Sequence, residues 1–137
     1  MDKPILDPGV SEILTIAETA SLQLQPAGNP GDNYKWKDVA IAGWKEIFGG
    51  IAIIRNDSFT AFNAAITIRQ GVSGLEQHTG VGAIYPLAAI TIITFPLLGP
   101  TDFNFKLPVT GTWINFEIIN YSSAVIDVTF GAYCRGR

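Results

Sequence analysis

The chain of 137 residues has 9 basic and 12 acidic residues, a net charge of -3 and a charged fraction of 15%. This length predicts one domain whose core is large enough to be stable without disulfides or metal ions. The single cysteine, Cys134, excludes a disulfide-built scaffold. The weakly acidic balance offers no electrostatic footprint for nucleic acid, so we expect no nucleic-acid partner. Soluble domains are usually about 25% charged, so this composition predicts apolar patches that a partner covers, and we expect a homo-oligomer.

The first 12 residues contain prolines and a glycine and show little periodicity. They predict an extended N-terminal arm, residues 1–12, before a single β-sandwich domain, residues 13–137. The arm has neither a basic nor an apolar signal region, so we expect no secretory signal and synthesis in a cytoplasm. The apolar residues of the arm that could dock on a neighbouring molecule are Pro4, Ile5 and Leu6.

The domain is expected to begin with a strand over residues 13–25, where aliphatic and polar residues alternate. An irregularity is possible at residues 18–19. A short helix over residues 10–20 is the alternative, because Ser11 could cap it. Residues 26–33, rich in glycine, proline and asparagine, predict a loop.

Two further strands are expected over residues 39–44 and 47–55. The second contains Gly49 and Gly50, which predict a bulge or a close approach of another backbone. Residues 59–69 alternate cleanly between apolar and polar side chains. With residues 47–55 they predict a hairpin that turns at residues 56–58.

A long apolar stretch follows a glycine-rich loop over residues 70–80. Residues 79–101 carry no charge, but prolines interrupt them and β-branched residues fill their middle, so we expect no membrane span. Instead, residues 83–95 predict a central strand that is buried on both faces. Another strand is expected over residues 103–107.

The last quarter of the chain, residues 112–133, predicts one long antiparallel hairpin. Its apolar faces consist of Ile114, Phe116 and Ile118 on the first strand and Ala124, Ile126, Val128, Phe130 and Ala132 on the second. A lone hairpin is marginally stable, so a second sheet must cover these faces. The fold class is therefore all-β, a two-sheet antiparallel sandwich, with a jelly roll of about eight strands preferred. An immunoglobulin-like sandwich is the alternative, although the paired cysteines of that fold are missing.

The side chains available for chemistry are few. The single histidine, His78, excludes most histidine-based sites, and neither a metal site with Glu76 nor a serine activated by His78 is favoured. Glu117 and Asp127 could face each other across the terminal hairpin, as glycoside hydrolysis requires, but exposed carboxylates on a sheet are ordinary. Arg135 could lower the pKa of Cys134, although a buried, unreactive thiol is favoured. We expect no enzyme activity, no cofactor and no metal.

Tryptophans are the remaining candidate binding residues: Trp36, Trp44 and Trp113. Packing in the core or at a subunit interface is the favoured reading, because tryptophan concentrates at interface anchors. The alternative is a carbohydrate-binding module, which would require two or three coplanar, exposed rings.

The proline-bearing arm, the glycine-rich strands of low charge and the closing segments 109–120 and 124–133 resemble small jelly-roll proteins of virions. The resemblance is to the decoration or cement proteins of tailed-phage capsids. It implies a homo-oligomer, often a trimer, that bridges the subunits of a capsid through its arm and an apolar base. It also implies a location in the virion, after synthesis in the cytoplasm of a host, and it carries over no role for any single residue.

Overall fold

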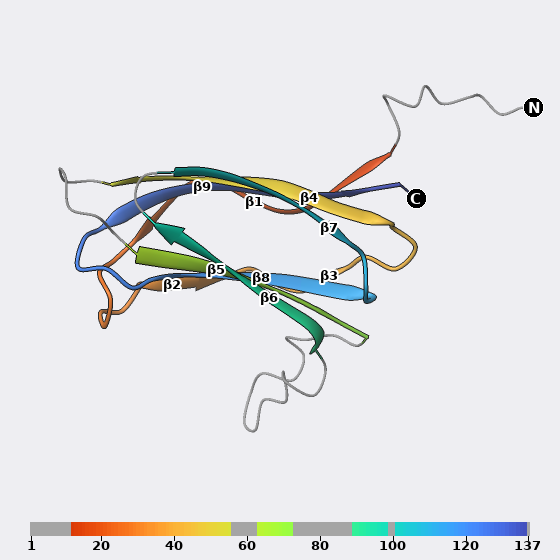
Figure 1. The fold of residues 1–137 in the computed structure, drawn as a ribbon, viewed down its shortest axis with the longest axis horizontal. Helices are drawn as coiled ribbons and strands as arrows, with labels where there is room; N and C mark the ends of the chain where they lie inside the picture. Colours follow the sequence, from red (N-terminus) through yellow and green to blue (C-terminus); the bar gives the residue numbers. More distant parts are fainter. Residues whose placement is uncertain (1–11, 56–62, 73–88, 99–100, 137) are drawn as a thin grey trace, which may run out of the picture.

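The protein is a sandwich of two stacked antiparallel sheets, as Figure 1 shows. The computed structural model describes residues 12–55, 63–72, 89–98 and 101–136, which contain nine strands and no helix. The strands are β1 (Ile13–Leu24), β2 (Asn33–Lys35), β3 (Val39–Ala40), β4 (Glu46–Arg55), β5 (Asn63–Gly71), β6 (Ala89–Leu98), β7 (Thr101–Pro108), β8 (Trp113–Asn120) and β9 (Ile126–Arg135). The predicted all-β sandwich is confirmed.

The strand order identifies the sandwich as a jelly roll. Sheet A has the order β1-β9-β4-β7, and sheet B has the order β2-β8-β5-β6, with β3 also paired to β8. The chain therefore passes from one sheet to the other at most of its connections. Among the described strands, β5 and β6 are the only consecutive strands that pair with each other. This interleaving is typical of jelly rolls, which contain two Greek keys.

Two predicted hairpins are wrong because their strands belong to different sheets. β8 pairs with β2, β3 and β5 in sheet B, whereas β9 pairs with β1 and β4 in sheet A. In the same way, β4 lies in sheet A and β5 in sheet B. The apolar faces meet across the core instead of lying side by side in one layer.

The predicted faces of the terminal strands are correct. The inward residues Ile114, Phe116, Ile118, Ile126, Val128 and Phe130 are all at most 2% exposed. The rings of Phe116 from sheet B and Phe130 from sheet A meet edge to face, with centroids 5.2 Å apart. Their contact is part of an aromatic cluster that joins the two sheets.

The elements of the first half of the domain agree in part with those predicted from the sequence. β1 is a strand and not a helix, and its pairing with β9 shifts register between Thr19 and Leu22, close to the expected irregularity. Residues 26–32 form the predicted loop. The strand expected over residues 39–44 is shortened to β3, because the chain turns at Gly43, whose φ is +89°.

Of the two alternatives expected at Gly49 and Gly50, a bulge or a close backbone approach, the structure shows the second. The register of β4 runs without a bulge against both β7 and β9, so that alternative is wrong. The close backbone approach is confirmed at Gly49, where an added Cβ would strike the carbonyl oxygen of Gly131 and lie 3.0 Å from the Cα of Ala132.

The apolar strand near residue 90 is not central. β6 ends the order of sheet B and, within the described residues, pairs only with β5. Its side chains alternate between half-buried and exposed, and Ile92 is 55% exposed. The expectation of burial on both faces is wrong, because no strand or helix of the described chain covers the outer face of β6.

Candidate assembly surfaces

The tryptophans are placed at three separate points of the fold. Trp36 is only 7% exposed and packs between Tyr34, 4.8 Å away between ring centroids, and Phe130, 4.7 Å away. Trp44 is half-buried against the core, and Trp113 is half-buried at the start of β8. A buried Trp36 cannot present its ring to a sugar, so the three rings do not form one exposed platform. The arm residues Pro4, Ile5 and Leu6 lie outside the described residues.

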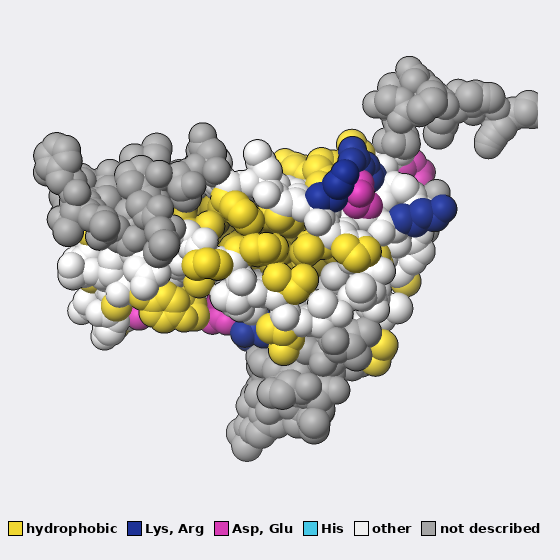
Figure 2. All heavy atoms as spheres, in the orientation of Figure 1, with side chains coloured by type: hydrophobic (Ala, Val, Ile, Leu, Met, Phe, Trp, Pro, Cys, Tyr) yellow, Lys and Arg dark blue, Asp and Glu magenta, His cyan; other side chains and the backbone are white. Residues whose placement is uncertain are grey.

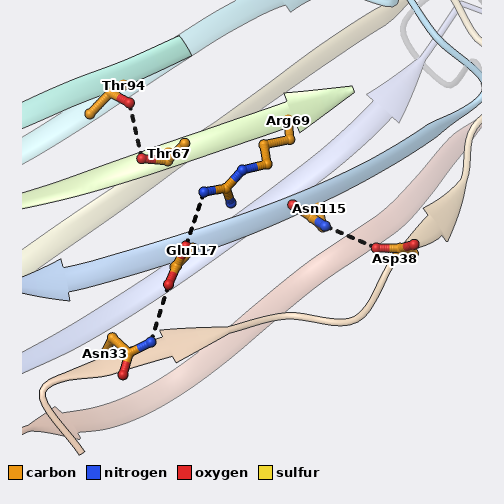
Figure 3. Close-up of polar contacts among 7 residues, drawn as sticks. All are labelled: Asn33, Asp38, Thr67, Arg69, Thr94, Asn115 and Glu117. Carbon is orange, nitrogen blue, oxygen red and sulfur yellow. Dashed lines mark hydrogen bonds and ion pairs between the residues drawn. The ribbon is translucent and has the colours of Figure 1, made fainter. Parts of the chain in front are cut away.

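A chain of polar contacts crosses the outer face of sheet B (Figure 3). Arg69 on β5 donates from Nη2 to Oε1 of Glu117 on β8 at 3.2 Å, and Asn33 on β2 donates to Oε2 of the same carboxylate at 3.1 Å. The hydroxyl groups of Thr67 and Thr94, 3.0 Å apart, extend the contacts to β6. These side chains tie the four strands of this face together.

The carboxylates and amides of this face differ from expectation. Glu117 lies in sheet B and Asp127 in sheet A, so the two carboxylates do not face each other across a hairpin. Asn115 is fully buried although it shares the outer face with Glu117, because its amide lies against Asp38 and donates to Oδ1 of Asp38 at 2.9 Å. Glu117 thus joins β2, β8 and β5, and Asp38 binds the amide of Asn115.

The outer face of sheet A is hollowed over two glycines of its central strands. Gly50 and Gly131 are register partners, and the shallow depression above them has a volume of about 390 Å³. Its rim includes Asn104, Thr129 and Tyr133. An added Cβ at Gly131 would lie 2.8 Å from the hydroxyl of Tyr133, so the glycine lets that side chain lie low over the sheet. No sequence pattern predicts this depression, because it arises from strands far apart in the chain.

Three charged side chains of the same face lie close together at one end of the sheet. Glu46 accepts from Nε of Arg135 at 2.6 Å, and Nζ of Lys106 lies 3.8 Å from its other oxygen. The guanidinium of Arg135 also lies 4.6 Å from the ring centroid of Phe48. These exposed pairs neutralise one another and contribute little to stability.

The described residues contain no group of three or more histidine, cysteine, aspartate or glutamate side chains placed to hold a metal ion. His78 lies outside the described residues. No helix in the described ranges is long and apolar enough to cross a membrane.

Cys134 points into the core and is fully buried, so the favoured reading of this thiol is supported. Desolvation by burial raises its pKa to about 11. In the unfolded chain the thiol has a pKa of about 8.5, so the unfolded state loses the proton first as the pH rises. The contribution of the neutral thiol is therefore complete below about pH 8 and is lost as the pH approaches 11.

We expect the free energy of unfolding to fall by about 1–2 kcal/mol more between pH 8 and pH 10 in the parent chain than in Cys134→Ala. Urea titrations of both chains at the two pH values measure this difference, since other groups titrate equally in both. If the free energy of unfolding changed equally with pH in both chains, burial would not raise the pKa of Cys134.

Comparison with known proteins supplies the fold but no family. No family description and no curated protein matches the chain. A chain of the virus-like particle of human norovirus GI.7, Houston strain, is 11% identical with a TM-score of 0.52, over 97% of this chain and 32% of that one. A chain of deformed wing virus, a honeybee pathogen, is 13% identical with a TM-score of 0.51, over 100% of this chain and 48% of that one.

The fold is a jelly roll, similar to that of the two viral chains. This chain spans less than half the length of the two viral chains that it resembles. Within this jelly roll, β6 and β7 are the last strands of sheets B and A on one side of the sandwich, and Figure 1 shows them crossing in front of the other strands. Figure 2, in the same orientation, shows hydrophobic side chains gathered between the two sheets. The half-buried residues of β6, β7 and the segment after β7 that pack against the core are Phe95, Phe103, Leu107 and Val109.

Proposed function

We propose that this chain is a non-enzymatic structural protein of a virion, which associates with itself and binds a larger protein shell. A capsid decoration or cement protein is the form that we favour. The observation that carries the proposal is the strand order of a jelly roll, in a fold shared with chains from two viruses. The low charged fraction supports it independently, because the surface has few charges to keep copies apart.

The contacts that we propose are apolar. The arm residues Pro4, Ile5 and Leu6 would dock on a neighbouring subunit or on the shell, and the half-buried Trp44 and Trp113 would contribute to subunit contacts. Trp36, which is buried, would support such a surface only from within. A trimer is the oligomer that we favour, in line with the resemblance to decoration proteins.

The mass of the chain in solution tests this proposal. We expect light scattering to give about three times the chain mass of 14.8 kDa, and a lower mass once residues 1–12 are removed. The deletion leaves every described strand in place, because β1 begins at Ile13. A chain that stays monomeric at every concentration, and that does not sediment with undecorated capsid shells, would refute the proposal.

A further inference from the structure

We propose that the edge of β6 with which no other described strand pairs binds β6 of a second copy of this chain, antiparallel and across a twofold axis, so that sheet B continues through both copies. This inference rests on the proposed self-association and names a surface for it. Pairing at a strand edge joins only two copies, so this contact is separate from one that would form a trimer.

The backbone hydrogen bonds of β5 determine which groups of β6 are free. Tyr121 donates to the carbonyl of Asn63 at 2.7 Å, and Thr112 donates to the carbonyl of Gly71 at 2.8 Å. Both acceptors are odd-numbered residues of β5, so its odd residues bond toward β8 and its even residues bond toward β6.

The register between β5 and β6 then gives the direction of each residue of β6. Ile66 lies opposite Phe95 and Ile68 opposite Ile93, so the odd residues of β6 bond to β5. The N–H and C=O groups of Ile92 and Thr94 therefore point away from the sheet.

The position of Pro96 is consistent with outward backbone groups at the even residues of β6. It is an even residue, and proline has no N–H to donate, so it is tolerated in a sheet where its nitrogen faces outward from an edge strand. Its position means that no bond to β5 is lost. It also limits the edge that a partner strand can use to the part of β6 before residue 96.

β6 differs in charge from the other three strands that end the sheet orders. β1 carries Glu18, β2 carries Lys35, and β7 carries Asp102 and Lys106, whereas no residue of β6 is charged. Proteins usually protect exposed strand edges with charged side chains, and an apolar edge is a template for pairing with another chain. β6 instead exposes 55% of Ile92.

The charge pattern also indicates the occupant. Every copy has the same weak net charge of -3, so no attraction between opposite net charges draws two copies together. The edge of β6 carries no charge, and the half-buried Phe95 packs against Phe103 of β7, so two copies can approach there without opposing like charges. The arm is a poorer fit for this edge, since residues 2, 3 and 7 are charged and residues 4 and 8 are prolines.

A twofold axis through Ile93 sets Ile92 of one copy opposite Thr94 of the other. Both residues have outward backbone groups, so each such pair exchanges two hydrogen bonds. The pairing is self-complementary, as a twofold contact requires. The exposed side chain of Ile92 then lies against the neighbouring copy.

Hydrogen exchange of the full chain tests the pairing directly. We expect the amides of Ile92 and Thr94 to be protected at high concentration and to exchange rapidly after dilution. We also expect Ile92→Lys, which places two ammonium groups at the axis, to weaken the pair about 100-fold. Gln23→Lys is the matched control, because it adds the same charge at an exposed position of the edge strand on the other side of the sandwich.

The other possible results distinguish a failure of the β6 contact from a failure of the proposed function. Oligomers in which the two amides exchange freely, or in which Ile92→Lys changes nothing, would overturn the β6 contact and leave the proposed function standing. Protection that does not depend on concentration would assign the edge to a segment of the same chain and also overturn the contact. A chain that is monomeric but binds capsid shells would overturn the self-association and the β6 pairing with it, and would leave only the binding to a shell standing.

Discussion

Gly49→Ala is expected to lower the free energy of unfolding by about 3 kcal/mol. The new methyl group would collide with the carbonyl oxygen of Gly131, and it would lie 2.7 Å from Cζ of Phe105 and 3.0 Å from Cα of Ala132. Two of these three atoms belong to the backbone of β9, so the central strands of sheet A would have to move apart. Urea unfolding followed by the fluorescence of the buried Trp36 measures the loss.

The neighbouring Gly50 supplies the control for this substitution. An added Cβ there meets first the side-chain oxygen of Asn104, at 2.6 Å, and that side chain is exposed and able to rotate away. We therefore expect Gly50→Ala to change stability by less than about 1 kcal/mol. Equal losses for the two variants would show that contact with the backbone of β9 is not what requires glycine at position 49.

Asn120→Leu is expected to cost about 4 kcal/mol, because it leaves several buried groups without partners. Asn120 is fully buried at the end of β8. Its Nδ2 donates to the carbonyl of Gln25 at 2.9 Å and of Ala124 at 2.7 Å, and its Oδ1 accepts from the backbone of Ser122 at 3.0 Å. One amide thus fastens the passage from sheet B to sheet A and joins it to the end of β1.

Ser122→Ala separates the role of this amide from that of its neighbour. The variant loses the hydroxyl that donates to Oδ1 of Asn120 at 2.6 Å and its longer contacts with the backbone of Ala124, but the amide of Asn120 keeps its own bonds to the backbone, so we expect a loss of about 1 kcal/mol. Thermal and urea unfolding of both variants give the comparison. Asn120→Leu with no more effect than Ser122→Ala would mean that the carbonyl groups of Gln25 and Ala124 find other partners.

The sequence predicts which side of a strand faces the core much better than it predicts which strands pair with each other. The alternation at Ile114, Phe116 and Ile118 places these side chains in the core, since a period of two determines which side of a strand is apolar. It carries no information about which strand lies beside β8. Sequential strands usually pair, so local hairpins are the natural expectation. In a jelly roll most connections cross between the two sheets, so that expectation fails.

The candidate surfaces were harder to predict for the same reason. The uncharged run at residue 90 is compatible with a strand buried on both faces and with an unprotected edge, and only the order of sheet B distinguishes them. The depression at Gly50 and Gly131 joins residues 81 positions apart in the chain. Trp36 was correctly expected to favour packing, because large rings rarely stay in water when a core can accept them.

The position of β9 has a consequence for how the protein is made. β9 is the last of the described strands in the sequence, yet it lies between β1 and β4, and Ile13 is the register partner of Arg135. During translation, β1, β4 and β7 leave the ribosome before the strand that joins β1 to β4. Sheet A closes only after β9 has been synthesised, and contacts between such distant segments make folding slow. The order of synthesis thus delays the native domain, and any assembly that depends on it, until β9 has left the ribosome.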